Sequence, residues 1–331
     1  MANLREESRR FRTRIPERPV SLMVTPLTDL GINHVREMQR MGISAIALDS
    51  GSLAAVRQAE GNVFRDIWKG VYQVVIVSPE RLTTKAMDDV LRSRSFRKHA
   101  GAYIVDEAHV VVPWSVDFRD AYGDVTRALS RLPPRIPVLA MTATLTKALE
   151  GKLLTQLNFR RGTYTRIRRS TERTNLSMIF RTLSHGLATA EAFPQLAWIV
   201  ARKQKIIVYA HTIDLCFRIA LYFWSLLPLG DERYRVVRMY NSVLPAGVNE
   251  ATLESYASDP GSYILVSTIK LSLGYDLRNV AGVVNVGCPT TAEALYQQGA
   301  RAARAPGTKG FVMTFVEPGL VRAFQKGTLE M

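Results

Sequence analysis

The residues Ala102-Tyr103-Ile104-Val105-Asp106-Glu107-Ala108-His109 decide the fold of this 331-residue chain. The apolar run 102–105 has the length of a buried strand, and it is followed at once by two acids. Parallel sheets bind their ligands at the carboxyl ends of such strands. One carboxylate at this position can hold Mg²⁺ through water while the next polarises an attacking water. The alternative is an acidic pair that caps a helix start.

Similar apolar runs recur along the chain and alternate with helix-length amphipathic stretches. Further predicted strands are Val20–Thr25, Ile43–Leu48, Val74–Ser78, Val138–Thr142, Ile206–Tyr209, Val236–Tyr240, Tyr263–Ser267, Val283–Val286 and Gly310–Phe315. The predicted helices between them include Leu30–Met41, Lys85–Leu91, Asp214–Leu226 and Thr291–Ala303. Buried strands spaced by helices predict an α/β fold of parallel sheets with helices on both faces.

The length of the chain predicts two domains, and a basic stretch indicates where they divide. Residues 160–181 hold seven arginines and a single acid, Glu172. This stretch is either a basic surface directed at phosphates or a solvated linker. The predicted organisation is a basic N-terminal segment 1–18, a first domain 19–160, a basic connection 161–190, a second domain 191–317 and a tail 318–331.

Composition favours a nucleic acid as partner and excludes several kinds of site. The 44 Lys and Arg residues exceed the 29 Asp and Glu residues, giving a net charge of +15, which favours a polyanionic partner. Two cysteines exclude a disulfide framework and a cysteine-rich zinc site, and five scattered histidines offer no metal-binding spacing. We expect no membrane span and no secretory signal, and therefore an intracellular protein, nuclear if the source is eukaryotic.

Several motifs follow one another in order from about residue 20 to residue 317, and together they resemble the RecQ group of superfamily 2 DNA helicases. The tetrapeptide Asp106–His109 is similar to the DEAH box. The resemblance implies two RecA-like parallel-sheet domains. It also implies ATP-dependent 3′–5′ DNA unwinding, with ATP and Mg²⁺ as cofactors.

One set of motifs resembles the DNA-contacting segments of this family. Val24–Leu27 resembles motif Ia and Val77–Leu82 resembles motif Ib, although each string alone could be a turn that contains proline. Residues 110–119 resemble the aromatic-rich loop, whose rings can stack on bases, whereas the alternative is a hydrophobic plug. The resemblance implies that nucleic acid contacts Thr25, Pro26, Ser78, Arg81, Trp114, Phe118, Arg119, Thr142, Thr144 and Thr268.

A second set resembles the nucleotide-binding segments. Ser170–Leu176 resembles the signature that opens the second RecA-like domain, Lys205–Ala210 motif IV, and Val266–Asp276 motif V. Tyr296–Arg304 resembles motif VI, whose two arginines, three apart on one helix face, can point at a γ-phosphate; alone, such a pair is usually a solvated face. The resemblance implies catalytic roles for Asp106, Glu107, His109, Gln297, Arg301 and Arg304. It places ATP against Asp106, Gly274, Asp276, Arg301 and Arg304, with Asp106 holding Mg²⁺ through water.

The chain departs from the family pattern at the phosphate-binding loop. No GxxxxGK[ST] string occurs in the 331 residues, so the first domain is predicted to lack the P-loop strand and helix and to leave apolar sheet surface uncovered. Ala300 and Ala303 replace glycines of motif VI, Ser272 replaces a glycine of motif V, and Pro113 and Val116 replace polar residues of the aromatic-rich loop. Added methyl groups at close-approach positions could push domains or nucleotide apart.

Two functions remain open from the sequence. The first is an ATP-dependent DNA helicase, acting on single-stranded DNA or on a duplex with a single-stranded tail, whose P-loop comes from upstream sequence or a second chain. The second is a catalytically inactive nucleic-acid-binding remnant. Both predict DNA affinity that falls steeply with salt, and only the first predicts dependence on nucleotide.

Overall fold

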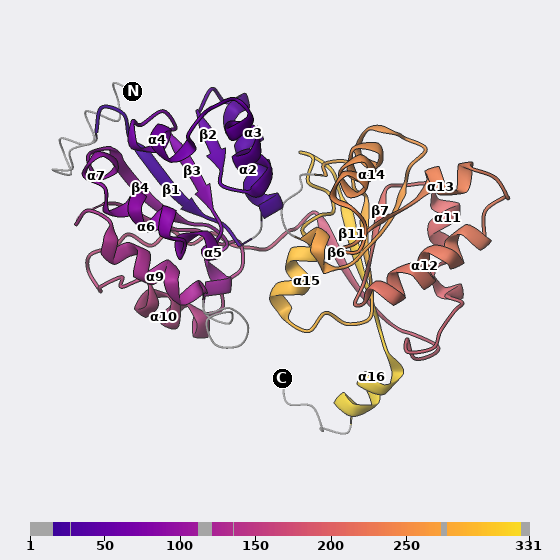
Figure 1. The fold of residues 1–331 in the computed structure, drawn as a ribbon. Helices are drawn as coiled ribbons and strands as arrows, with labels where there is room; N and C mark the ends of the chain where they lie inside the picture. Colours follow the sequence, from indigo (N-terminus) through magenta and orange to yellow (C-terminus); the bar gives the residue numbers. More distant parts are fainter. Residues whose placement is uncertain (1–15, 27, 112–120, 135, 273–276, 326–331) are drawn as a thin grey trace. The chain divides into compact units, whose positions relative to one another are not determined.

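The computed structural model describes residues 16–26, 28–111, 121–134, 136–272 and 277–325, and the chain forms two units that divide between Arg169 and Ser170 (Figure 1). Each unit has one sheet in the described residues, and every strand pair in both sheets is parallel. The predicted fold class, two parallel-sheet α/β domains, is confirmed.

The sheet of the first unit has the strand order β2-β3-β1-β4-β5. Its strands are β1 (Val20–Val24), β2 (Ala45–Ala47), β3 (Val74–Val77), β4 (Ala100–Val105) and β5 (Val138–Ala140). Its helices are α2 (Thr28–Arg40), α3 (Ser50–Gln58), α4 (Val63–Trp68), α5 (Pro79–Leu82), α6 (Lys85–Arg92), α7 (Arg94–His99), α9 (Ala121–Arg131) and α10 (Lys147–Gln156), with a short 3₁₀ turn η1 (Ala108–Val110). The strand β1 lies in the middle, because Leu22 pairs with Val75 on one side and with Tyr103 on the other.

The two faces of this sheet are buried by different helices, as the two-residue period of a strand requires. Leu22 and Val24 belong to the larger core, which includes side chains of α4, α6, α7 and α10. Met23, between them, belongs to a smaller core under α2. The strands therefore read as continuous apolar runs because both of their faces are covered.

Strand β5 is the last strand of the sheet as the described residues form it. In the part of the chain that the structure describes, β5 pairs only with β4. Leu139 within it is 49% exposed and Met141 just beyond it is 36% exposed. The sequence Val138–Met141 is apolar like that of an interior strand, although these side chains are partly exposed among the described residues.

The sheet of the second unit has the order β6-β11-β10-β7-β9-β8. Its strands are β6 (Leu176–Thr182), β7 (Ile206–Ala210), β8 (Val237–Tyr240), β9 (Ile264–Ser267), β10 (Gly282–Val286) and β11 (Gly310–Val316). Its helices are α11 (Trp198–Arg202), α12 (Ile213–Ser225), α13 (Glu232–Val236), α14 (Ala246–Ser258), α15 (Ala292–Gly299) and α16 (Pro318–Gln325), with 3₁₀ turns η2 (Pro194–Leu196) and η3 (Ile269–Ser272). Ile206 and Val208 face the core that contains α12, and Ile207 faces the core that contains α14.

The predicted connection 161–190 needs a correction. Residues 176–182 form β6, which pairs along its whole length with β11, so they belong to the second sheet. The division of the chain at Arg169 and Ser170 leaves 170–190 in the second unit. The arginines on either side of β6 make this part of the sequence look like a basic linker and not like a strand. Its exposed position at the sheet edge, with Phe180 57% exposed, also weakens the apolar pattern.

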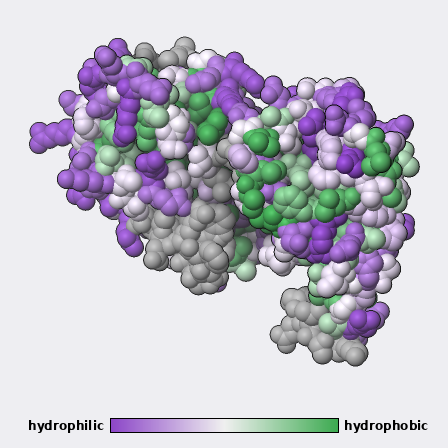
Figure 2. All heavy atoms as spheres, turned by 45° about the vertical axis from the view of Figure 1, so that its right-hand side comes forward, coloured by the Kyte–Doolittle hydropathy of each residue, from purple (hydrophilic) through white to green (hydrophobic). Residues whose placement is uncertain are grey.

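The surface differs between the units in the view of Figure 2. Hydrophilic side chains cover most of the visible face of the first unit, on the left, whereas apolar side chains gather on the visible face of the second. Among the described helices, none has the length and apolar character needed to cross a bilayer.

Candidate functional site

The predicted DNA- and nucleotide-contacting residues of the first unit meet at the carboxyl edge of its sheet. Thr25, Ser78 and Asp106 directly follow the neighbouring strands β1, β3 and β4. Backbone hydrogen bonds hold these strand ends together, because the N–H of Thr25 donates to the carbonyl of Val77 at 3.0 Å and that of Asp106 donates to the carbonyl of Val24 at 2.9 Å. One edge of the sheet therefore presents hydroxyls next to carboxylates.

A pocket of about 170 Å³ opens at the ends of β1, β2 and β3, and we call it the first-unit pocket. Its polar lining residues are Thr25, Thr28, Asp49, Ser50, Ser78 and Arg81. Hydroxyl groups and a guanidinium are the side chains that bind phosphate oxygens of a nucleic acid backbone. Three of the predicted residues, Thr25, Ser78 and Arg81, thus meet in one cavity. Pro26 is buried beside it and does not line it.

Sequence reasoning missed Thr28, Asp49 and Ser50 in this pocket. Asp49 caps helix α3, accepting from the N–H groups of Gly51 and Ser52 at 2.8 and 3.0 Å and from the Ser52 hydroxyl at 2.6 Å. Its charge is therefore compensated by donors of its own helix. The string Asp49-Ser50-Gly51-Ser52 after an apolar run is an N-cap signal that could have located this wall of the pocket.

Each acid of the tetrapeptide lies close to a histidine. Asp106 Oδ2 lies 2.9 Å from Nε2 of His34, which projects from α2. Glu107 Oε2 lies 3.2 Å from Nδ1 of His109. Glu107 has a left-handed backbone, with φ of 46°, an uncommon conformation that clusters at functional sites. The contact between Asp106 and His34 was not predicted, because 72 residues separate the two and no local sequence pattern indicates it.

The predicted hydroxyl of Thr142 contacts His109, which lies close to Glu107. His109 Nδ1 lies 2.8 Å from Thr142 Oγ1, and that oxygen donates its hydrogen to the carbonyl of Thr144 at 2.9 Å. Since a hydroxyl has one hydrogen, Nδ1 must be the donor to Thr142. The buried His109 therefore links Thr142 and Glu107, and Thr144 contributes backbone groups to the same network.

The side chains at this edge of the sheet could bind Mg²⁺ only if phosphate oxygens supplied further ligands. No cluster of three or more His, Cys, Asp or Glu side chains suited to a metal occurs among the residues with described positions. Mg²⁺ is usually held by one or two carboxylates, waters and substrate phosphates, so Asp106 fits as its single carboxylate. A triphosphate fits less well, because no GxxxxGK[ST] string is present to supply backbone donors.

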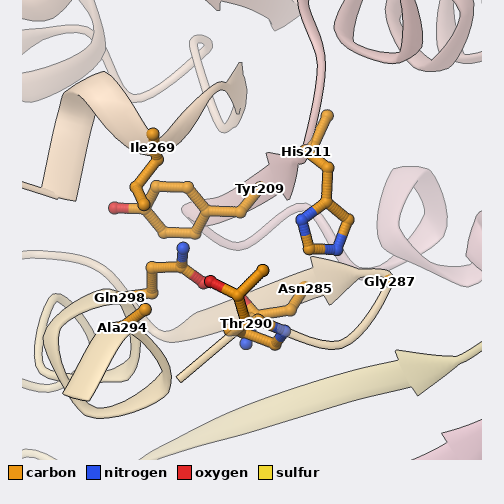
Figure 3. Close-up of a pocket in the computed structure, with 10 residues that line it drawn as sticks. Tyr209, His211, Ile269, Asn285, Gly287, Thr290, Ala294 and Gln298 are labelled. Atoms are coloured by element: carbon orange, nitrogen blue, oxygen red, sulfur yellow. The ribbon is translucent and has the colours of Figure 1, made fainter. Parts of the chain in front are cut away.

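The second unit has a pocket of similar size at the carboxyl ends of β7 and β10, which we call the second-unit pocket. Figure 3 shows Tyr209 and His211 on one side of it and Asn285, Thr290 and Gln298 on the other. Asn285 and Gln298 are 1% and 6% exposed, and their side-chain oxygens Oδ1 and Oε1 accept no hydrogen bond from any residue that the structure describes. A ligand with hydrogen-bond donors would satisfy them.

The hydroxyl of Tyr209 is fully enclosed at this pocket. Burial raises the pKa of Tyr209 to about 12, although the nearby guanidinium groups of Arg301 and Arg304 act in the opposite direction. Tyr209 is therefore neutral and serves as a hydrogen-bonding group beside two cations. Sequence reasoning missed Tyr209 as well as His211, Asn285 and Gln298, since they are separated along the chain and only the fold assembles them.

The predicted helix face that carries Arg301 and Arg304 is wrong. Helix α15 ends at Gly299, and both arginines lie in the turn beyond it. Ala303 between them has a φ of +49°, which ends any helical spacing. Arg301 is 4% exposed, and the Nε of Arg304 donates to the carbonyl of Ala300 at 2.9 Å. Gln297 lies within α15, near its end.

The remaining predicted residues divide into two kinds. Thr268 follows β9 and is 7% exposed, outside the lining of the second-unit pocket. The positions of Trp114, Phe118, Arg119, Gly274 and Asp276 lie outside the described residues, as do those of Pro113 and Val116.

Two protein-family models match this chain. The family model "DEAD/DEAH box helicase" matches residues 7–151, and "Helicase conserved C-terminal domain" matches residues 189–306. ATP-dependent DNA helicase RecQ of Haemophilus influenzae is 27% identical over 312 residues, which are 94% of this chain and 46% of that protein. ATP-dependent helicase wrn-1 of Caenorhabditis elegans is 26% identical over 288 residues, 86% of this chain and 26% of that protein. The chain thus spans less than half the length of these relatives.

Solved structures agree on the fold. Mss116p bound to ssRNA and AMP-PNP superposes with a TM-score of 0.66 at 19% identity, covering 93% of this chain and 62% of that one. Helicase Lhr of Mycobacterium smegmatis, bound to ssDNA and AMP-PNP, gives a TM-score of 0.64 at 18% identity, covering 97% and 44%. Both units therefore have the RecA-like helicase fold.

Proposed function

We propose, from the premise that this chain is a RecQ-like member of the superfamily 2 helicases, that it grips a DNA strand during ATP-dependent 3′–5′ unwinding. The observation that supports this most is the first-unit pocket, where Thr25, Ser78 and Arg81 converge one strand away from Asp106 and Glu107. A strand held at β1 and β3 would lie beside the carboxylates that act on nucleotide. We place the substrate, single-stranded DNA or a duplex with a single-stranded tail, in the nucleus if the source is eukaryotic.

Strand binding requires only groups that the chain has. The hydroxyls and the guanidinium of the first-unit pocket suit phosphate oxygens, and the net charge of +15 draws a polyanion to the whole surface. The pocket supplies no dense pattern of base-edge donors and acceptors. We therefore expect binding that depends weakly on base sequence.

The nucleotide step needs something more. In it Asp106 would hold Mg²⁺ through water, Glu107 would orient the attacking water, and Arg301 and Arg304 would face phosphate charge. The 331 residues encode no phosphate-binding loop, so we assign no hydrolysis to them alone. The loop would come from sequence outside these residues or from a second chain.

A second candidate function is DNA binding without hydrolysis. It is favoured by the engagement of Asp106 with His34 at 2.9 Å, which occupies an oxygen that a metal-bound water would need. It is also favoured by the left-handed alanine between the two arginines.

Strand binding is tested with a fluorescent single-stranded oligonucleotide and increasing salt. We expect Arg81→Gln to weaken binding and to reduce the slope of log affinity against log salt by about one. Arg92→Gln is the matched control, because Arg92 on α6 is exposed, outside the pocket and equal in charge. If both variants lost the same DNA affinity, the pocket would contribute no more to binding than any other part of the positive surface.

Hydrolysis is tested by ATP turnover with and without single-stranded DNA, with Glu107→Gln as the control. Turnover that DNA stimulates and that Glu107→Gln abolishes would show that the chain is a motor. Turnover no greater than that of Glu107→Gln, with DNA binding intact, would favour the second candidate.

A further inference from the structure

The turn that contains Arg301 and Arg304 is fastened from a distant part of the second unit. Arg173 Nη2 donates to the carbonyls of Ala303 and Ala302 at 2.8 and 3.3 Å. Asn175 Nδ2 donates to the same Ala303 carbonyl at 3.1 Å. A single carbonyl between the two arginines thus accepts from two side chains that precede it by about 130 residues.

Arg173 and Asn175 act as one rigid pair. Arg173 Nε donates to Asn175 Oδ1 at 3.0 Å, so each side chain fixes the orientation of the other. Asn175 Nδ2 also donates to the carbonyl of Thr308 at 2.9 Å, and this contact fastens the far end of the same turn. Asn175 directly precedes β6 and Arg173 lies two positions before Asn175, and β6 lies beside β11 in the sheet. The pair therefore rests on a rigid element.

Ala303, the residue that these hydrogen bonds hold, has an unfavourable backbone conformation. Ala303 has a φ of +49°, a region that L-residues other than glycine avoid because Cβ crowds the backbone. Its N–H donates to the carbonyl of Val280 at 2.8 Å, so both of its peptide groups are held. Rotation of Ala303 toward ordinary φ would redirect Arg304 and pull on Arg301 beside Tyr209.

We propose that Arg173 and Asn175 are positioning residues that set the directions of the Arg301 and Arg304 guanidinium groups by clamping the Ala303 carbonyl. The inference rests on the proposed function, in which those two arginines face phosphate charge. Arg173 donates hydrogen bonds to the backbone of the turn and to Asn175, so the pair acts through Ala303 on the arginines.

The test follows the arginine side chains directly in the full chain. Nε–Hε NMR signals of ¹⁵N-arginine-labelled protein are assigned with Arg301→Lys and Arg304→Lys. We expect Arg173→Gln, and separately Asn175→Ala, to shift or broaden the signals of Arg301 and Arg304. Arg181→Gln is the matched control, since Arg181 is an exposed arginine on β6 and loses the same charge.

A second variant separates positioning from stability. Ala303→Gly relieves the left-handed strain, so in the Arg173→Gln background it should recover part of any lost melting temperature. Because glycine leaves the turn freer, it should not restore the Arg301 and Arg304 signals. Recovery of both together would overturn the proposal and make the clamp a stabilising contact only.

Anion binding gives a further readout, with inorganic triphosphate as the probe. We expect Arg173→Gln to weaken triphosphate binding by about tenfold, as loss of an orienting outer contact commonly does, and Arg181→Gln to change it little. Unchanged guanidinium signals and affinity in Arg173→Gln and Asn175→Ala would overturn the proposal. Absence of triphosphate binding in the unaltered protein would count against the proposed nucleotide role, while the signals alone still decide the positioning role.

Discussion

At the scale of single residues, Gly287 shapes the second-unit pocket by having no side chain. Its φ is +96°, and a Cβ built on it would lie 2.3 Å from both Cδ2 and Nε2 of His211. The imidazole of His211 therefore occupies the space that any other residue would fill. Gly307 also has a positive φ, of +75°, but a Cβ there would meet no atom within 4 Å.

We predict that Gly287→Ala destabilises the second unit by about 2–3 kcal/mol, because backbone strain and a clash with His211 add. Gly307→Ala should cost about 1 kcal/mol, since only the backbone is strained. Urea denaturation measures both. The double variant Gly287→Ala/His211→Ala should recover the excess cost, and an equal cost for the two single variants would contradict the clash.

The place of a functional residue could be predicted from the sequence where residues next to it in the chain indicate it. It could not be predicted where the contact is made by residues that are distant in the chain and that only the fold brings together. The tetrapeptide Asp106–His109 lies at a strand end, as its preceding apolar run indicated. The contact of His34 with Asp106 has no such local signal. The hydrogen bonds of Arg173 and Asn175 to Ala303 also have no local signal, although the string 170–176 that contains both residues resembles a family signature.

At the scale of elements, one arginine joins α13 to the end of α14. Arg235 donates to both oxygens of Asp259 at 2.8 and 2.9 Å, and the N–H of Gly261 donates to the same carboxylate at 2.9 Å. These hydrogen bonds lower the pKa of Asp259 from 3.8 to about 2. A lowered carboxyl pKa stabilises the fold above the ordinary value, and this contribution is lost as pH falls from about 4 toward 2.

We predict that Arg235→Gln raises the pKa of Asp259 back toward 3.8, because the main hydrogen bonds to its charged form are lost. Carboxyl ¹³C NMR signals followed from pH 6 to pH 1.5 would measure it. Arg238→Gln should have a much smaller effect, since Arg238 acts only through its charge and is the weakest of the causes. An Asp259 pKa that stays near 2 in Arg235→Gln would contradict this account.

Strand β5 supports a prediction about association. An unpaired edge with an exposed apolar side chain is a template for another chain, and natural edges are commonly protected by lysine. We predict that Leu139→Lys lowers concentration-dependent light scattering while changing unfolding free energy by no more than about 0.5 kcal/mol, because Leu139 is 49% exposed. Leu139→Ile keeps the apolar edge and should scatter like the unaltered protein. Equal scattering by the lysine variant would show that this edge does not associate.

Helices and strands could be predicted from the sequence where the pattern of apolar residues continued without interruption. All the strands expected from apolar runs occur, with shifts at their ends, because both sheet faces are buried. Strand β6 was missed, since its burial is incomplete and arginines flank it. Helix α15 is shorter than the predicted Thr291–Ala303. The N–H groups of Arg301 and Ala302 donate only three residues back, to Gln298 and Gly299, and Ala303 is held by Val280, Arg173 and Asn175 instead of by the helix.

At the scale of the whole molecule, the exposed basic stretch between the units should be the first site of cleavage by trypsin. Residues 160–163 and 165–172 are exposed, and they include Arg160, Arg161 and Arg169. We predict two protease-resistant fragments that divide between 160 and 169, identified by mass spectrometry during a time course. An earliest cut inside either sheet would contradict the division at Arg169 and Ser170.

One acid moderates this cleavage. Glu150 on α10 pairs with Arg166 at 2.8 Å and with Arg168 at 2.9 Å, and so fastens part of the stretch to the first unit. Glu150→Gln should therefore speed the cuts after Arg166 and Arg168. Glu254→Gln, which removes an exposed charge from α14, is the control and should leave the rate unchanged.

The existence of two domains was predictable from chain length and from the run of arginines, but the place where they divide was not. Charge indicates that a stretch is solvated, and it does not show which sheet takes up the residues that follow. Pairing of β6 with β11 decides that question, and it joins residues that are more than a hundred positions apart.

The parallel pairing of every strand also governs the order in which the chain can fold. The central strand β1 is made before both of its partners, since Ser21 pairs with Val74 on one side and with Ala102 on the other. The contact order is therefore high, and β1 must wait for both partners before its edges are covered. During translation the first sheet can close only after β4 has emerged from the ribosome. Until then the apolar strand β1 has unpaired edges. During this interval the nascent chain is most prone to aggregate and most in need of a chaperone.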